Sequence, residues 1–200
     1  MRHIGRFGCI AIVACASLAG ESAGARFEHY REAADRCRFL VNESRTREAE
    51  HSCREAVTRA GQLPAAAKRE RIAANSLAAQ VYLDLGLPED ALSFAGPASK
   101  LAQAGLPATD MLRGAVRYQL ARCNEGLGRL QEAQQDYEAA VRDLDTAVRR
   151  AGAPSQRKAS ATLRDALQSY RQLLSAEGKN DQAAAIAKQL GAAAEPTGKP

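Results

Sequence analysis

Small and apolar residues recur along this chain at a regular interval. An alanine follows an acidic or amide residue at Glu48-Ala49, Asp90-Ala91, Glu132-Ala133 and Gln182-Ala183, and these alanines are 42, 42 and 50 residues apart. Five residues before them stand Ser44, Gly86, Gly128 and Gly178. A repeat of this length, rich in alanine and leucine and with few β-branched runs, predicts consecutive hairpins of two α-helices.

Glycines and prolines mark where the helices end and begin. A glycine after a helix can adopt the positive φ that ends it, and a proline suits the first turn of the next helix. The glycines of the repeat therefore predict the turns within hairpins, and the segments 61–64, 105–107 and 152–154 predict the connections between hairpins. The pattern predicts eight helices, at about 27–43, 46–60, 65–85, 88–104, 109–127, 130–150, 155–177 and 179–190.

One position conflicts with this scheme. Gly96-Pro97 lies inside the fourth predicted helix. Proline lacks the backbone N–H and costs about 3 kcal/mol in a helix interior unless the helix bends. We expect a kink or a split helix there, which either shapes a groove for a partner or is simply tolerated.

The units resemble the tetratricopeptide repeat family. The second carries Ala79, Tyr82, Leu85-Gly86, Ala91 and Ala98; the third Ala121, Leu127-Gly128, Ala133, Tyr137 and Ala140; the fourth Tyr170, Leu174, Gly178 and Ala183. The resemblance covers residues 27–190 and implies an all-α, right-handed superhelix of antiparallel helix pairs, a TPR-like α-solenoid. The family's usual period is about 34 residues, so the 42-residue spacing implies longer helices, as in the extended variants of the family.

The first 25 residues follow a different pattern. Arg2 and Arg6 precede an apolar run over residues 7–19, and Ala23 and Ala25 form a pair of small residues. This pattern predicts a secretory signal peptide, residues 1–25, of a bacterial-style exported protein, with cleavage near Ala25. The repeat domain then spans residues 26–190, and residues 191–200 form a disordered tail.

An alternative for the N-terminus is a lipid anchor. The segment Ile12-Val13-Ala14-Cys15 resembles a lipoprotein processing box. In that case Cys15 would become the lipidated first residue of the mature chain, and the protein would be attached to a membrane. The apolar run of about 13 residues is too short for a membrane-spanning helix, which needs roughly 20.

The resemblance implies a binding site on the concave face of the superhelix, which the first helix of each pair lines. Carried over residue by residue, the groove positions are Arg38, Asn42, Gln80, Asp84, Tyr118, Arg122, Glu125 and Gln172. Long polar side chains can bind the backbone or the carboxylates of a peptide, and arginine binds a carboxylate with two N–H groups. The alternative is that these residues are only solvated. The family's best-known Lys and Asn set for carboxylates is not matched.

Three cysteines remain outside the predicted signal peptide. Cys37 and Cys53 fall on the two helices of the first hairpin, and a disulfide between them would stabilise the fold by roughly 3 kcal/mol. The alternative is a metal site that adds His29 and His51, but two residues of separation turns His51 and Cys53 toward different helix faces. Cys123 lies on a face predicted to be packed, as a small buried thiol.

Composition and motifs bear on the remaining functional classes. Hydrophobic residues make up 46% of the chain and aromatic residues 4%, which favours packed helices, and the formal net charge is +5. Charges of both signs interleave, which is typical of a solvated helix face and not of nucleic-acid binding. Phosphate loops, serine-centred elbows and zinc-protease motifs are missing.

The sequence therefore predicts a non-enzymatic scaffold, without a cofactor, that binds a polypeptide partner in the periplasm or outside the cell. A membrane would be involved only through lipidation at Cys15. Self-association through an apolar terminal unit is a further expectation, because the ends of a repeat stack have no neighbour. A small helical hydrolase or metal-binding protein is the alternative from another functional class.

Overall fold

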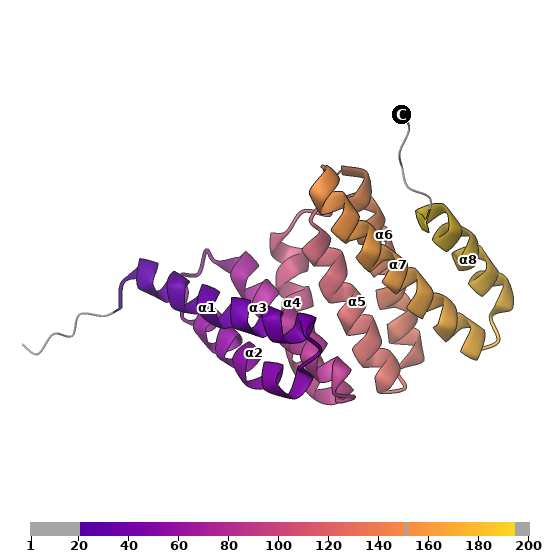
Figure 1. Ribbon diagram of the computed structural model, residues 1–200. Helices are drawn as coiled ribbons and strands as arrows, with labels where there is room; N and C mark the ends of the chain where they lie inside the picture. The colour runs from indigo at the N-terminus through magenta and orange to yellow at the C-terminus, as the bar shows by residue number, and fades with distance from the viewer. Residues whose placement is uncertain (1–20, 151, 195–200) are drawn as a thin grey trace, which may run out of the picture.

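The computed structural model describes residues 21–150 and 152–194 and contains eight helices over these ranges (Figure 1). They are α1 (Ala23–Asn42), α2 (Thr46–Gly61), α3 (Lys68–Asp84), α4 (Pro88–Gly105), α5 (Met111–Gly126), α6 (Leu130–Arg150), α7 (Ala153–Ala176) and α8 (Asn180–Ala194). The predicted signal run at residues 7–19, Cys15 and the last six residues of the predicted tail lie outside the described residues.

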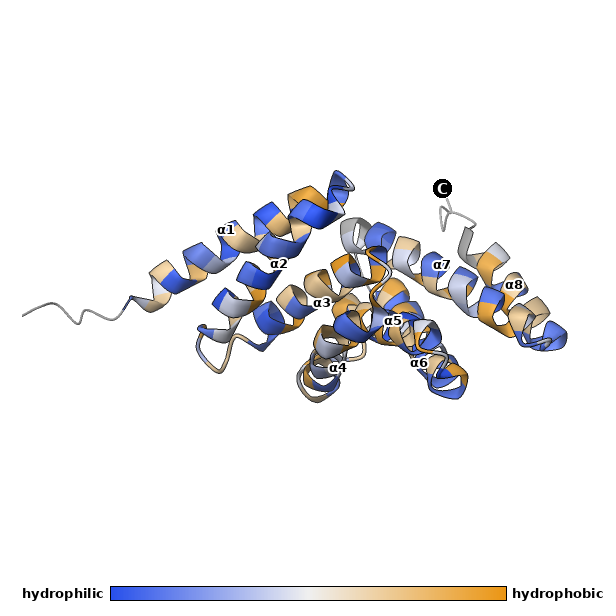
Figure 2. Ribbon diagram, turned by 90° about the horizontal axis from the view of Figure 1, so that it is seen from below, coloured by the Kyte–Doolittle hydropathy of each residue, from blue (hydrophilic) through white to orange (hydrophobic). Residues whose placement is uncertain are grey.

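Successive helices pair into four hairpins that stack along one direction. Each helix contacts the next one in the chain, and in addition α1 contacts α3, α3 contacts α5, and α5 contacts α7. Within the described residues the even-numbered helices do not contact one another. Because the odd-numbered helices are closer together, the stack curves toward them, and α4 and α6 lie on the outer side (Figure 2). The prediction of an all-α solenoid of antiparallel pairs is confirmed.

The turn inside each hairpin has a left-handed residue at the position that the repeat marked. Gly86, Gly128 and Gly178 have φ angles of 73°, 70° and 74°, and Ser44 has a φ of 57°. The following helix begins two residues after each of these four positions. The N–H of the residue in between donates a hydrogen bond to a carbonyl of the preceding helix. The spacing of 42 residues in sequence thus repeats as one turn geometry in space.

Among these four turn positions, Ser44 is the one where the left-handed backbone costs the most free energy. A Cβ in the left-handed region costs about 1 kcal/mol, which glycine avoids. We expect Ser44→Gly to raise the free energy of unfolding by roughly 0.5 kcal/mol, since the unfolded chain gains freedom as well. Chemical denaturation measures this. The control Ser93→Gly changes an exposed helical position and should lower the free energy of unfolding by roughly 0.5–1 kcal/mol. A change of the same sign in both variants would contradict the role of Ser44 in the turn.

Small residues allow the paired helices to approach closely. The alanines that the repeat placed at the crossings are fully buried: Ala79, Ala91, Ala98, Ala121, Ala133 and Ala140 all have 0% exposure. Gly114 has the same role on α5, because a Cβ built there would lie 2.6 Å from Cγ of Leu144 and 3.0 Å from its backbone N on α6. Close packing of short side chains is therefore what holds each hairpin together.

Several helix boundaries differ from the predictions. Helix α3 begins at Lys68 and not near residue 65, because the guanidinium of Arg71 binds the carbonyls of Ala60, Leu63, Pro64 and Ala65 and so holds the connection in a non-helical form. In the next connection Arg113, 42 residues later, donates to the carbonyl of Leu106, and α5 begins at Met111 and not at 109. The prolines of these connections precede the helices instead of starting them.

The ends of the chain also differ. Helix α1 begins at Ala23, earlier than predicted, because the hydroxyl of Ser22 accepts a hydrogen bond from the N–H of Ala25 and caps the helix. Helix α8 continues to Ala194, so residues 191–194 are helical and not part of a loose tail. Helix α4 is continuous through Pro97, so the expected split does not occur. The exposed side of the helix at Pro97 leaves room for the proline ring.

Candidate protein-binding surface

The inner side of the curve is formed by α1, α3, α5 and α7. These are the first helices of the four hairpins, as the resemblance implied for the concave face. The predicted groove residues all lie on these four helices. Their surroundings differ from helix to helix, and the middle of the stack is where side chains from different hairpins meet.

Four of the predicted residues lie within one connected group on α3 and α5. The Nε2 of Gln80 donates to Oδ1 of Asp84 at 2.6 Å. The same Asp84 oxygen is 3.9 Å from Nη2 of Arg122 on α5. The Arg122 guanidinium lies 5.9 Å from the centre of the Tyr118 ring, and the Tyr118 hydroxyl is 3.1 Å from the Ser169 hydroxyl on α7. We call Gln80, Asp84, Tyr118 and Arg122 the central cluster.

The electrostatics of the central cluster leave Arg122 able to bind a further group. Its side chain is 30% exposed and that of Asp84 37%, so their ion pair at 3.9 Å contributes at most about 1 kcal/mol. The aromatic face of Tyr118 adds about 0.5–1 kcal/mol and fixes the direction of the guanidinium. A guanidinium has five N–H donors. An incoming carboxylate or carbonyl oxygen can therefore be bound without breaking either contact.

A buried polar pair beneath this surface fixes α3 against α5. The Ser76 hydroxyl donates to Oε1 of Gln119 at 2.9 Å, and Nε2 of Gln119 donates to the Ser76 carbonyl at 3.0 Å. Both residues are 8% exposed. Reciprocal hydrogen bonds satisfy the buried groups and set the register of the two helices. The two helices that carry the central cluster are thus joined by buried hydrogen bonds.

The predicted residues on the outer hairpins stand apart from the central cluster. Arg38 pairs with Asp35 at 2.5 Å on its own helix, and Asn42 is exposed at the end of α1. Gln172 is exposed on α7. These three residues lie on the inner helices α1 and α7, but the structure does not bring them into contact with the central cluster.

Glu125 differs from the groove position that the resemblance implied. Its carboxylate accepts a hydrogen bond of 2.5 Å from the hydroxyl of Tyr137 on α6, the partner helix of the same hairpin. Burial and the adjacent carboxylate raise the pKa of Tyr137 well above its ordinary value of 10.0. The carboxylate is therefore used inside the hairpin. Tyr137 also stacks on Tyr170 of α7, with ring centres 5.7 Å apart.

The cysteines are arranged as the sequence predicted. Cys37 and Cys53 form a disulfide between α1 and α2, with Cα atoms 4.9 Å apart. Both are buried and their sulfurs are bonded to each other, so in this form they do not serve as ligands of the alternative metal site with His29 and His51. Cys123 is fully buried, and burial raises the pKa of its thiol to about 12.

Sequence reasoning missed an arginine and aspartate group next to the surface. Asp143 on α6 is 8% exposed and lies 3.1 Å from Nε of Arg113 and 3.4 Å from Nε of Arg117. The sequence gives one sign of the role of Arg113: it stands 42 residues after Arg71. Both arginines donate to carbonyls of the connection before their own helix. Arg113 and Arg117 thus join α5 to α6 within the third hairpin through the carboxylate of Asp143.

Across residues 21–150 and 152–194, every helix is too short or too polar to cross a bilayer.

Comparisons with known proteins give the fold. No family model matches the sequence, and no curated protein does. The structure is similar to a crystal structure of a TPR-like protein from Chlorobium tepidum, with a TM-score of 0.62 and 18% identity over 76% of this chain and 98% of that chain. It is also similar to the TPR-like repeats of a putative kinesin light chain from Podosopora anserina, with a TM-score of 0.50 and 16% identity over 82% and 93% of the two chains. The right-handed superhelix of helix pairs that the resemblance implied is thereby confirmed as the fold.

Proposed function

We propose that this chain, which has a tetratricopeptide-type fold, is a scaffold that holds a polypeptide partner on the inner side of its helix stack. The observation that carries this proposal is the central cluster, in which side chains from α3 and α5 converge above a buried hydrogen-bonded base. An oriented arginine beside glutamine and aspartate suits the mixed donors and acceptors of a peptide backbone and its carboxylates. Arg38, Asn42 and Gln172 extend the same surface toward both ends.

The compartment is part of the proposal. A disulfide that closes the first hairpin is stable in an oxidising environment such as the periplasm or the cell exterior. Together with the predicted signal peptide, this favours an exported protein. The mass of the mature N-terminus distinguishes cleavage near Ala25 from lipidation at Cys15, because cleavage leaves a chain that begins near Arg26 and carries no lipid.

The function is tested by photocrosslinking in the native compartment. A photoreactive residue placed at Gln80 on the inner side should capture one defined partner, whereas the same residue at the exposed Lys100 on α4 should not. Capture at both positions to the same extent, or at neither, would contradict a binding surface on the inner side.

Charge reversal then tests the central arginine. Arg122→Glu places a carboxylate beside Asp84, and we expect partner capture to fall by about tenfold or more, which corresponds to roughly 1.4 kcal/mol of lost binding. The control Arg142→Glu changes the same charge on α6, where the side chain is 69% exposed, and should leave capture unchanged. An unchanged Arg122→Glu result, with thermal unfolding as in the parent, would show that the central cluster does not bind the partner.

A further inference from the structure

One aromatic residue at the N-terminal end of the stack is exposed although its counterparts are buried. Phe39 on α1 has 57% exposure. The equivalent residues of the later hairpins, 42, 84 and 134 positions on, are Val81, Cys123 and Leu173, with exposures of 0%, 0% and 3%. Each packs in a cluster with residues of the preceding hairpin. Phe39 thus occupies a position that elsewhere in this fold contacts another hairpin.

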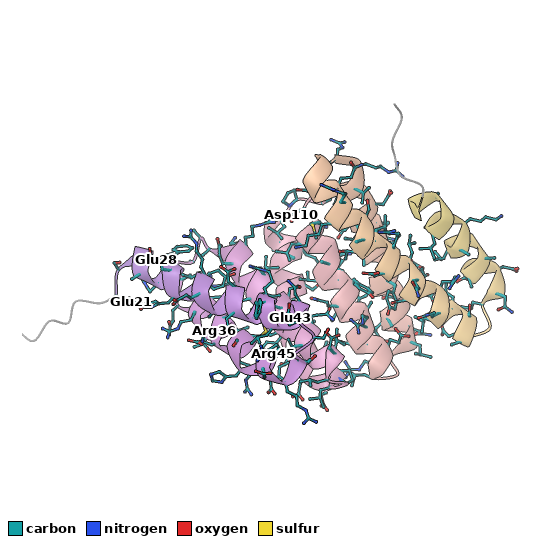
Figure 3. All side chains as sticks on the ribbon, in the orientation of Figure 1. Glu21, Glu28, Arg36, Glu43, Arg45 and Asp110 are labelled. Atoms are coloured by element: carbon teal, nitrogen blue, oxygen red, sulfur yellow. A yellow bond between two sulfur atoms is a disulfide. The ribbon has the colours of Figure 1, made fainter. Side chains whose placement is uncertain are left out.

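The residues around Phe39 are charged where the second and third hairpins are apolar. Glu32, Arg36 and Glu43 stand at the positions of Ala74, Ala78 and Leu85. Figure 3 shows Arg36 along α1 and Glu43 just after its end. His29, Glu32 and Arg36 line one wall of a shallow pocket, whose other wall is Glu55 and Arg59 of α2. An aromatic residue with a polar rim is typical of a reversible protein interface. We call Glu32, Arg36, Phe39 and Glu43 the front edge.

The opposite end of the stack offers the complementary side of the same repeat interface. On α6, Gln134, Glu138 and Val141 face the last hairpin: Glu138 accepts from the Tyr170 hydroxyl, Gln134 accepts from Lys179, and Val141 packs on the cluster of Leu163 and Leu167. Fifty residues later, the equivalent positions on α8 are Ala184, Lys188 and Gly191, and all three are exposed. We call these three residues the rear edge.

The rear edge has room for a large side chain. A Cβ built on Gly191 meets no atom within 4 Å. The counterparts of Gly191 in the first and third hairpins are Val57 and Val141, which pack on clusters that contain Ala74 and Ala166, the counterparts of Glu32. The repeat geometry therefore places an incoming Glu32 at Gly191. It places an incoming Phe39 beside Ala183 and Ala187 on α8, because Val81, Cys123 and Leu173 each share a cluster with the counterparts of these two alanines.

We infer that two copies of this chain associate head to tail, with the front edge of one on the rear edge of the next, Phe39 seated beside Ala187 and Glu32 facing Gly191. Charge supports this pairing. The front edge carries two carboxylates and one guanidinium, whereas the rear edge carries the ammonium group of Lys188 and no carboxylate. Attraction between the two edges guides the encounter and disfavours front-to-front pairing, where Glu32 and Glu43 would meet the same carboxylates.

Head-to-tail contact has a defined consequence for assembly. The two edges of one interface are different surfaces, so each added copy leaves one front edge and one rear edge free. The chain should form short linear oligomers whose average size grows with concentration. The inner sides of successive copies then continue one another, because the interface repeats the relation between hairpins within a chain.

The experiment uses the full chain and two variants, one for each edge. Phe39→Asp removes the aromatic anchor, and Gly191→Glu fills the rear edge with a carboxylate while it has space within its own chain. Analytical ultracentrifugation should show concentration-dependent oligomers for the parent and monomers for each variant alone. An equimolar mixture should give dimers and nothing larger, because the intact rear edge of one variant meets the intact front edge of the other.

Other results would overturn the inference. Oligomers that are lost in Phe39→Asp but kept in Gly191→Glu would mean a symmetric front-to-front dimer. A parent that is monomeric at all concentrations would exclude association of copies. Crosslinks from a photoreactive residue 39 to residues 1–20 of its own chain would show that this segment, and not a second copy, covers the front edge. Leu130→Asp, at another exposed apolar residue (38%), is the control and should behave as the parent; circular dichroism verifies that all variants are folded.

Discussion

Replacement of both Cys37 and Cys53 by alanine is expected to lower the free energy of unfolding by about 3 kcal/mol. The disulfide closes a loop over a sequence separation of 16 residues, and the lost constraint on the unfolded chain has this size in the chain-entropy description. Alanine is the matched replacement, because Ala79 and Ala95 occupy the equivalent positions of the second hairpin. Urea unfolding of the oxidised parent and the variant measures the difference.

Reduction of the parent provides the internal control for this prediction. Dithiothreitol should lower the stability of the parent toward that of the variant and should leave the variant unchanged. The loss should be concentrated in α1, which packs on other helices from one side only, so its amides should show the largest gain in hydrogen exchange. A difference below about 0.5 kcal/mol between oxidised and reduced parent would contradict a stabilising role.

The second large effect is expected for Gly114→Ala. Alanine is the better helix former by about 1 kcal/mol, so a reading of α5 as an isolated helix predicts stabilisation. The structure predicts the reverse, because the new Cβ would lie within 3.0 Å of Leu144, whose side chain is fully buried and has no space to retreat. Overpacking of this kind costs roughly 1–3 kcal/mol.

Gly191→Ala is the matched control for this substitution. Gly191 is also helical, but a Cβ there meets no atom within 4 Å. The free energy of unfolding of the Gly191→Ala variant should stay the same or rise by a few tenths of a kcal/mol, since residue 191 is near a helix end. Chemical denaturation of both variants gives the comparison. If both substitutions changed the free energy of unfolding in the same direction, the close approach of α5 and α6 would not restrict the size of the side chain at residue 114.

The proposed binding surface and the proposed association have different physical origins. The central cluster lies on α3 and α5 in the middle of the stack, and the two edges lie at its ends, on α1 and α8 (Figure 1). Arg122→Glu should therefore leave the oligomers intact, and Phe39→Asp should leave the contacts of the central cluster intact. The two sets of variants separate partner binding from self-association in the same protein.

Much of the fold follows from local chemistry that the sequence shows directly. Left-handed turns need a residue that tolerates positive φ, so Gly86, Gly128 and Gly178 predicted the hairpins at the correct positions. Alanines at the crossings predicted which helices pair. The pairing of Cys37 with Cys53 also followed, because the two helices of one hairpin bring these positions together.

The candidate site followed only in part from the same reasoning. Gln80, Asp84, Tyr118 and Arg122 are linked by contacts, because the repeat fixes their positions on the neighbouring helices α3 and α5. Glu125 differed from its implied groove position because its long side chain can turn toward the groove or toward α6. It accepts a short hydrogen bond from the hydroxyl of Tyr137 on α6. Sequence position alone does not settle such a choice.

What the sequence by itself determined is the repeated unit: where each helix turns, which small residues lie between helices, and which cysteines meet. These are properties of a few neighbouring residues and do not need the rest of the chain. The tertiary structure decided the rest, namely that Arg71 delays the start of α3, that Gly114 has no room for a methyl group, and that Phe39 has no hairpin before it in the described chain. Each of these depends on distances between segments remote in sequence, and such distances are fixed only when the hairpins stack.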